Sequence, residues 1–152
     1  FRNDALAPVC AVILVTGAGG MFGGVLRDCG IGTARAGVLS DTRMPVILAA
    51  FLVSTALRVA QGSATVALTT TAALMAPTVA ATAGLSDLDL TFIVIAIAGG
   101  ATVLSHFNDS GFWLVSRFLN MDEKTTLKTW TVMETLLGTI AFLIVAMASI
   151  VF

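Results

Sequence analysis

The sequence predicts an all-helical membrane protein. Of its 152 residues, 57% are hydrophobic and only 11% are charged, whereas a soluble domain carries roughly 25% charged residues. So few charged side chains cannot cover a protein of this size in water, and lipid must surround most of the chain. The charges also gather in short stretches between long apolar runs. Together with a net charge of only −1, this excludes a cytosolic enzyme and a nucleic-acid-binding domain.

The first apolar run covers residues 5–26 and holds no charged side chain. At about 1.5 Å per residue it is long enough to cross a hydrocarbon core roughly 30 Å thick, so we predict a transmembrane helix there. Its middle holds two overlapping GxxxG pairs, Gly19 with Gly23 and Gly20 with Gly24. Such pairs allow another helix to approach closely; alternatively, the glycines make a flexible point beside a substrate.

The second apolar stretch, residues 44–84, is too long for one crossing. Fully helical, it would extend about 60 Å, which is twice the thickness of the hydrocarbon core. The polar sequence Gln61-Gly62-Ser63 interrupts it near the middle. We therefore predict a hairpin or a pair of helices with its tip near residues 61–65. Irregular backbone at membrane depth must be surrounded by protein or line a wet cavity.

The third stretch, residues 90–119, reads as a broken transmembrane helix. Apolar sequence stops at a polar segment, residues 105–111, and then resumes. After a polar turn, the last transmembrane helix is predicted over residues 129–152. Trp130 lies at its start beside Lys128, and this pair of residue types is typical of a membrane interface.

A cluster of polar residues at the hairpin tip is the candidate substrate site. An arginine inside a membrane span costs about 2.5–3.5 kcal/mol, so Arg58 is expected to face a cavity or a partner. Ser63 is expected to cap a new helix starting at Ala64, whose free N–H groups suit an anion such as a carboxylate. Alternatively, Arg58 extends to the interface and the hydroxyls bond their own helix. The candidate substrate-binding residues are Arg58, Gln61, Gly62, Ser63 and Thr65.

A second polar cluster lies at the break in the third stretch. Its histidine and aspartate can change protonation near neutral pH when their surroundings shift their affinity for protons, as proton coupling requires. Oxygen ligands around an unwound backbone can instead hold Na⁺. A purely structural alternative is that Asn108 and Asp109 cap the following helix. The candidate coupling residues are Ser105, His106, Asn108, Asp109 and Ser110.

The sequence carries no pattern typical of an enzyme. His106, Asp109 and Ser110 lie too close together in sequence to meet in the geometry of a hydrolase triad. Cys10 and Cys29 lack the spacing of metal ligands. We therefore expect neither catalysis nor a cofactor nor a bound metal, and two polar breaks in apolar helices favour secondary transport instead.

Four long motifs resemble the C-terminal part of the GntP-type gluconate permeases, and the resemblance extends over essentially the whole chain. It implies a proton symporter for gluconate or a related sugar acid, with several spans in the bacterial inner membrane. It also implies an ion-transporter-superfamily fold, in which each inverted repeat contributes a hairpin and a broken helix. The motifs are ILVTGAGGMFGGVL (13–26), ALRVAQGSATVALTTTAALMAP (56–77), SHFNDSGFWLVSRFLNMD (105–122) and TTLKTWTVMETLLG (125–138).

The resemblance implies that residues 1–152 are the C-terminal repeat of a protein about three times longer. The expected partners are the sugar acid, H⁺, the lipid bilayer, the missing N-terminal repeat and, in a homo-oligomer, further copies of the protein. By motif, substrate contacts fall at Arg58, Gln61, Ser63 and Thr65, and coupling falls at His106, Asn108 and Asp109. Two alternatives stay open: a Na⁺-coupled carboxylate or D-amino-acid symporter of similar fold, and a membrane scaffold subunit that transports nothing.

Overall fold

The computed structural model describes Met21, Val25 and residues 45–151. Apart from Met21 and Val25, the helix predicted over residues 5–26 lies outside the described residues. The glycines of its predicted packing face lie outside them as well: Gly19, Gly20, Gly23 and Gly24.

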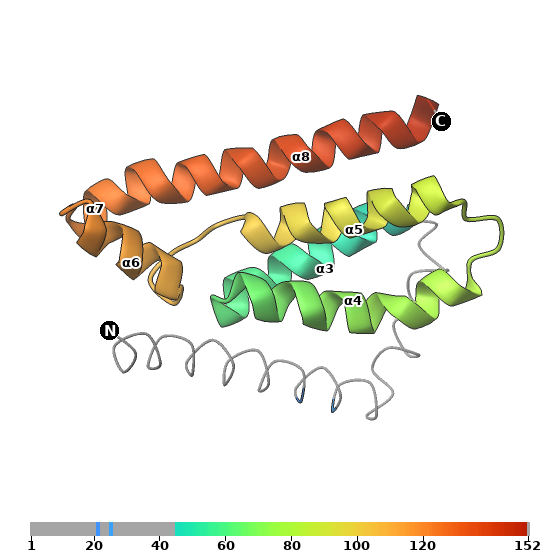
Figure 1. Ribbon diagram of the computed structural model, residues 1–152, viewed down its shortest axis with the longest axis horizontal. Coiled ribbons are helices and arrows are strands. Elements are labelled where there is room, and N and C mark those ends of the chain that lie inside the picture. Colours follow the sequence, from blue (N-terminus) through green and yellow to red (C-terminus); the bar gives the residue numbers. More distant parts are fainter. Residues whose placement is uncertain (1–20, 22–24, 26–44, 152) are drawn as a thin grey trace, which may run out of the picture.

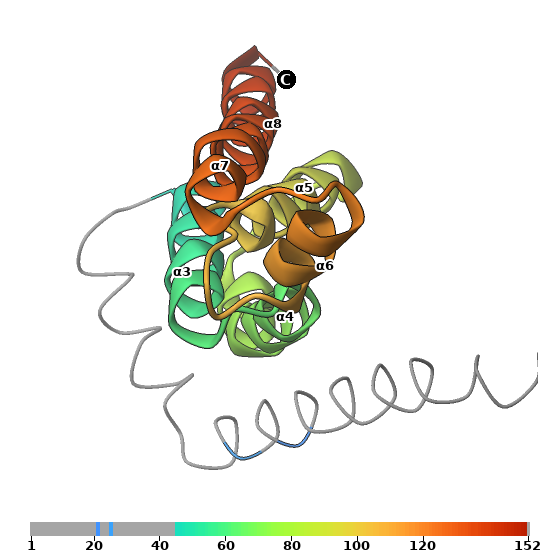
Figure 2. The same ribbon diagram turned by 90° about the vertical axis from the view of Figure 1, so that its left-hand side faces the viewer.

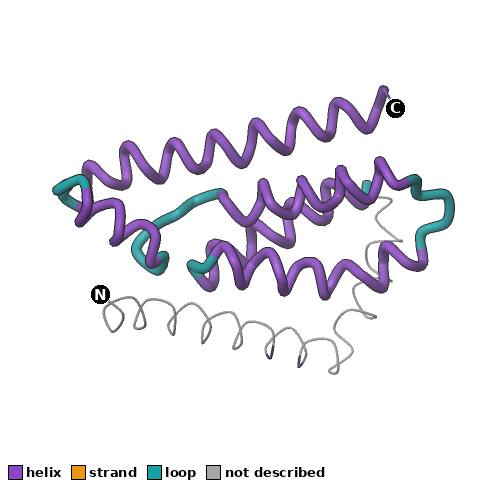
Figure 3. The backbone as a smooth tube through the Cα atoms, in the orientation of Figure 1, coloured by secondary structure: helices purple, strands orange, loops and turns teal. Residues whose placement is uncertain are grey.

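Every regular element in the described part of the chain is a helix, which confirms the predicted all-α class there (Figures 1 and 3). The elements are α3 (Val46–Gln61), α4 (Ala64–Ala81), α5 (Asp87–Thr102), α6 (Ser110–Phe118), α7 (Glu123–Thr126), the π-helical turn η1 (Leu127–Thr131) and α8 (Val132–Val151).

Helices α3 and α4 lie side by side and are joined by a two-residue break (Figure 1). Gly62 ends α3 in the left-handed conformation, with φ at 77°, and its N–H donates to the Arg58 carbonyl at 2.8 Å. Glycine adopts this conformation without the steric cost of a Cβ atom. Ser63 then opens α4 by accepting a hydrogen bond from the Val66 N–H at 3.4 Å. The expected cap at Ser63 is therefore confirmed.

Helices α5 and α6 are separated by an extended linker, residues 103–109 (Figure 3). A capping box formed by Ser86 and Asp89 starts α5, and α6 starts at Ser110 after its N-cap, Asp109. The linker thus overlaps the polar segment, residues 105–111, that interrupts the third apolar stretch.

The last helix begins earlier than residue 129, because Asp122 caps it by accepting a hydrogen bond from the Thr125 N–H at 2.9 Å. Part of the sequence expected to form a polar turn is therefore helical, and α7, η1 and α8 follow one another without a break. Within the described residues, two helices are long and apolar enough to cross a membrane: Ala64–Ala81, and Glu123–Val151 with a mean hydropathy of 2.1.

Helix α5 is the centre of the packing, with α8 on one side and the α3–α4 hairpin on the other (Figure 2). Its glycines allow backbones to touch: a Cβ atom on Gly100 would lie 2.5 Å from the Phe51 carbonyl oxygen, and one on Gly99 would lie 2.9 Å from the Gly138 oxygen. Small residues permit this approach in membranes, where dispersion contacts drive helix association. One cluster of buried apolar residues joins α3, α4 and α5: Ala49, Ala50, Met75, Ile93 and Ile97.

The contact between α5 and α8 predicts a strong effect of side-chain size at Gly138. In a full-length protein that contains this chain, Gly138→Val should lower the free energy of unfolding by about 1–3 kcal/mol, because the added atoms must push α8 away from the Gly99 carbonyl. The melting temperature in detergent measures this effect. Leu137→Met, at an exposed neighbouring position, is the control, and equal melting of the wild type and Gly138→Val would contradict the prediction.

Candidate functional site

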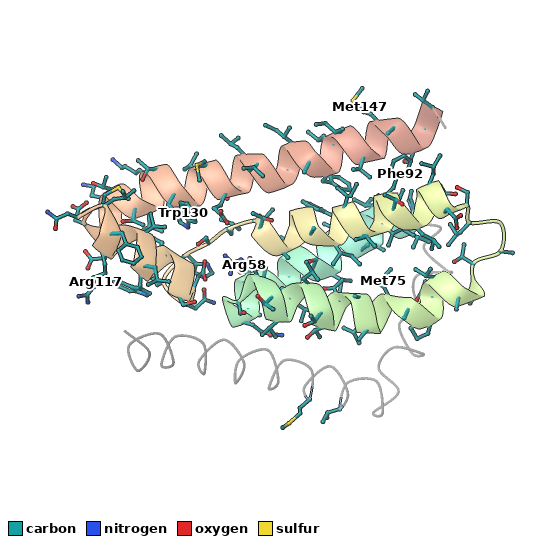
Figure 4. The ribbon with its side chains drawn as sticks, viewed as in Figure 1. Arg58, Met75, Phe92, Arg117, Trp130 and Met147 are labelled. Atoms are coloured by element: carbon teal, nitrogen blue, oxygen red, sulfur yellow. The ribbon has the colours of Figure 1, made fainter. Side chains whose placement is uncertain are left out.

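The two helix breaks meet at a buried ion pair. Arg58 lies in the last turn of α3, and only 2% of it is exposed. Its Nη2 atom lies 2.5 Å from Oδ2 of Asp109, the residue that opens α6 and lies 51 positions further along the chain. Figure 4 shows Arg58 at the end of the hairpin that faces the linker. Burial of these charges is tolerable because each compensates the other.

The guanidinium of Arg58 makes two hydrogen bonds within the described part of the chain, one from each Nη atom. Nη1 donates a hydrogen bond to the Gly62 carbonyl oxygen, and Nη2 donates to Asp109. Nε is buried and has no acceptor within the described part of the chain. The alternative in which Arg58 extends to the membrane interface is therefore wrong: the side chain turns inward and binds the opposite break.

Asp109 combines a capping role with an electrostatic one. Its Oδ1 accepts from the Gly111 N–H at 3.0 Å, which caps α6, while Oδ2 accepts from Arg58 and from the Ser105 hydroxyl. Asn108 does not cap the helix, contrary to the structural alternative, because its side-chain amide donates to the Val59 carbonyl at 2.9 Å. Both residues thus tie the linker to the end of α3.

The hairpin tip and the linker also touch through their backbones. A Cβ atom added to Gly62 would collide with the carbonyl group of Asn108. Gly62 is therefore required twice, once for its left-handed φ and once for this contact. Arg58 also donates to the carbonyl oxygen of Gly62. The side chain that binds Asp109 therefore holds the hairpin tip as well, and the ion pair and the backbone contact reinforce each other.

Ser105 connects the ion pair to the last helix. Its hydroxyl donates to Asp109 and accepts from Nε1 of Trp130 at 2.9 Å, while its carbonyl accepts from the Thr131 hydroxyl. Trp130 is half-buried, and its indole N–H thus binds the linker. Both partners from the last helix lie in the π-helical turn η1, and such turns are frequent at functional sites.

The other candidate residues surround this cluster without joining it. His106 is half-buried, and its Nδ1–H donates to the Leu104 carbonyl at 2.7 Å. Gln61 and Ser63 are half-buried at the tip, and Thr65 and Ser110 are exposed in the first turns of α4 and α6. The structure thus joins four of the candidates in one network: Arg58, Gly62, Ser105 and Asp109.

The sequence did not lead us to place Trp130 or Thr131 in the site. For Thr131, a signal of its orientation was present. Thr131, Gly138 and Val145 are buried and recur every seven residues along the last helix. A repeat of that spacing marks one face of a helix. It would have placed Thr131 on the inward face of the predicted last helix.

A cavity of about 420 Å³ opens between α6 and the start of the last helix, but it does not include the ion pair. Its lining is mostly apolar and offers no charged group to an anion. The residues that line it are Val115, Leu119, Met121, Thr129, Trp130 and Met133. Because Arg58 is almost fully buried, a ligand reaches its guanidinium only if neighbouring groups move.

Comparison of the sequence with known proteins assigns the chain to a family. The family model described as GntP family permease matches residues 1–151. The chain belongs to this family. This confirms the resemblance, and because the family and its named relatives are permeases and transporters, it also confirms the expectation that the chain is not an enzyme.

Characterised relatives are similar over nearly the whole chain. The low-affinity gluconate transporter of Escherichia coli (strain K12) is 42% identical over 93% of this chain and 32% of its own length. The gluconate permease of Zymomonas mobilis is 36% identical over 95% of this chain and 32% of its own length. The Gnt-II system L-idonate transporter of Escherichia coli (strain K12) is 35% identical over 93% of this chain and 31% of its own length. The chain spans about a third of the length of these relatives. No solved structure matches it.

The ion pair predicts a non-additive pattern of stability. In a full-length permease that contains this chain, Arg58→Met or Asp109→Leu alone should lower the free energy of unfolding by about 3–5 kcal/mol, because each leaves a buried charge unpaired. The double substitution should cost much less than the sum, since it removes both charges.

Chemical unfolding of the purified permease in detergent measures these differences. Glu123→Gln is the control, because Glu123 is exposed at the start of α7, and its effect should stay within about 0.5 kcal/mol. Additive losses in the double variant would contradict the pairing.

Proposed function

We propose that this chain is the C-terminal part of a permease that takes up gluconate or a related sugar acid together with protons across the bacterial inner membrane. The observation that carries the proposal is the ion pair between Arg58 and Asp109 where two helix breaks meet. Membership of a permease family and relatives named for gluconate and L-idonate support the substrate class.

The arrangement of the helices supports a transporter built from inverted repeats. The α3–α4 hairpin and the broken pair α5–α6 are the elements that one repeat of the ion-transporter superfamily would contribute, and α8 packs along α5. In transporters of this kind, substrate and coupling ions bind at broken helices near the membrane midplane. The other half of the site would come from the N-terminal repeat, and movement between the two repeats would expose the site to each side in turn.

The hairpin tip has the chemistry to bind a carboxylate. Helix α4 begins at Ala64, and the backbone N–H groups of its first turn, with the positive end of the helix dipole, attract an anion. The exposed hydroxyl of Thr65 and the half-buried Gln61 and Ser63 lie at the same tip and can bind the hydroxyl groups of a sugar acid. Arg58 lies one turn before the tip and supplies the positive charge.

Substrate and Asp109 then compete for one guanidinium. Asp109 already compensates the positive charge of Arg58, so we expect a bound carboxylate to share this charge with Asp109 or to replace the Asp109 contact. A displaced Asp109 leaves a net negative charge in a region of low dielectric constant, which is costly unless a cation binds. A proton is the cation we propose. Na⁺, held by oxygen atoms of the linker, is the alternative that the coupling experiment distinguishes.

The proposal predicts loss of transport on either side of the pair. Arg58→Ala should abolish uptake of labelled gluconate because the substrate loses the cation that binds its carboxylate. Asp109→Asn should abolish uptake because a neutral amide cannot draw Arg58 away from the bound substrate. We expect roughly tenfold or greater losses in uptake rate, with normal amounts of permease in the membrane. Asp122→Asn, at an exposed cap, is the control.

Ionophores separate the coupling ions in the same assay. Uptake by the wild type should fall when a protonophore collapses the proton gradient and should persist when the sodium gradient is removed. The opposite result favours a Na⁺ symporter. Wild-type uptake in both Arg58→Ala and Asp109→Asn would contradict the site and would fit a scaffold role instead.

A further inference from the structure

One ionisable side chain on the inward face of α8 has no role in the site described above. Glu134 lies between Thr131 and Gly138, three residues after the first and four before the second. Residues at these spacings share one face of a helix, and both neighbours are buried in the packing against the linker and α5. Glu134 therefore belongs to the packed face of a helix whose apolar span would cross the membrane.

The residues next to Glu134 contact the linker that carries Asp109. Trp130, four residues before it, donates to Ser105, and Thr135, directly after it, accepts from the Leu104 N–H at 3.2 Å. Glu134 is half-buried on this same turn of α8. Within the described residues, its carboxyl group has no hydrogen bond or ion pair of its own. It is thus an unpaired acid beside a closed pair.

An unpaired carboxylate in this position is costly, whereas a protonated carboxylic acid is not. Moving a charge into a membrane span costs several kcal/mol unless a partner compensates it. Arg58 is already committed to Asp109 and the Gly62 carbonyl. A charge on Glu134 is therefore costly while the pair is closed, and it becomes costlier still when a substrate carboxylate adds a further negative charge beside it.

We propose that Glu134 carries the proton that is transported with the sugar acid, an inference that rests on the proposed function. When a substrate carboxylate binds Arg58, Asp109 and Glu134 become two uncompensated negative charges close together. A proton taken from water on the outer side then forms an O–H bond on the Glu134 carboxylate. After the site opens inward and the substrate leaves, Arg58 pairs with Asp109 again, and the proton returns to water on the inner side. One proton moves with each sugar acid.

The other titratable groups around α8 are less suited to this role. His106 donates from Nδ1 to the Leu104 carbonyl, and within the described residues it forms no hydrogen bond with Arg58 or Asp109. Asp109 already accepts from Arg58, Ser105 and Gly111. The acids of α5, Asp87 and Asp89, lie in its first turn, at the end opposite the linker. On the remaining elements packed near the pair, the charged residues are exposed: Arg117, Glu123, Lys124 and Lys128.

The test is Glu134→Gln in the full-length permease reconstituted into liposomes, with Glu123→Gln on the same continuous helix as the matched control. Two activities are measured with labelled gluconate: exchange against internal gluconate at equal pH, and accumulation driven by an inward proton gradient. Glutamine preserves shape but binds no proton. Glu134→Gln should keep exchange within about twofold of the wild type and lose accumulation by roughly tenfold or more, whereas Glu123→Gln should keep both.

Accumulation by Glu134→Gln at the wild-type level overturns the inference alone. A wild type that ignores the proton gradient overturns the proposed proton coupling, so the two failures are distinguishable. If Glu134→Gln does not reach the membrane or loses both activities, Glu134→Asp decides. A shifted pH dependence of accumulation in Glu134→Asp supports the role, and an unchanged pH profile overturns it.

Discussion

The ion pair between Arg58 and Asp109 is the interaction on which the rest of the site depends. It joins the end of α3 to the start of α6, and it is flanked by the backbone contact between Gly62 and Asn108. Ser105 extends the network to the last helix. Because a buried guanidinium needs a compensating charge, Asp109 holds the two breaks together for as long as no other anion is offered. The same requirement underlies the proposed competition between Asp109 and a substrate carboxylate.

Away from this cluster, the helices are held by close packing of small residues. Gly99 and Gly138 bring α5 and α8 into backbone contact, and Gly100 does the same for α5 and α3. These contacts hold α3, α5 and α8 together and leave no room for a ligand where the backbones touch. The charged network is concentrated at one end of these helices, where the hairpin tip, the linker and η1 converge (Figure 4). A change in the pair can therefore alter the breaks while the packed helices stay as they are.

Much of this arrangement follows from the sequence, because apolar runs, their polar interruptions and an arginine in a span each have a direct physical consequence. The α3–α4 break and the cap at Ser63 are local features, so the residues that form them are adjacent. The partner of Arg58 is not local: no rule of spacing connects residues 51 positions apart. Composition also could not show that the last helix begins early, at its cap Asp122. Nor could it show that the Trp130 indole N–H donates to Ser105. These outcomes depend on which elements meet in space.

The most direct measurement of the central claim is the dissociation constant of gluconate for the purified full-length permease, compared between Arg58→Ala and Asp109→Asn by titration calorimetry. If Asp109 and the substrate compete for Arg58, the two substitutions must act in opposite directions. Asp109→Asn should bind gluconate more tightly, by roughly tenfold, and Arg58→Ala should bind it at least as much more weakly. Equal weakening by both substitutions would contradict the account, because it would mean that the pair only holds the fold together.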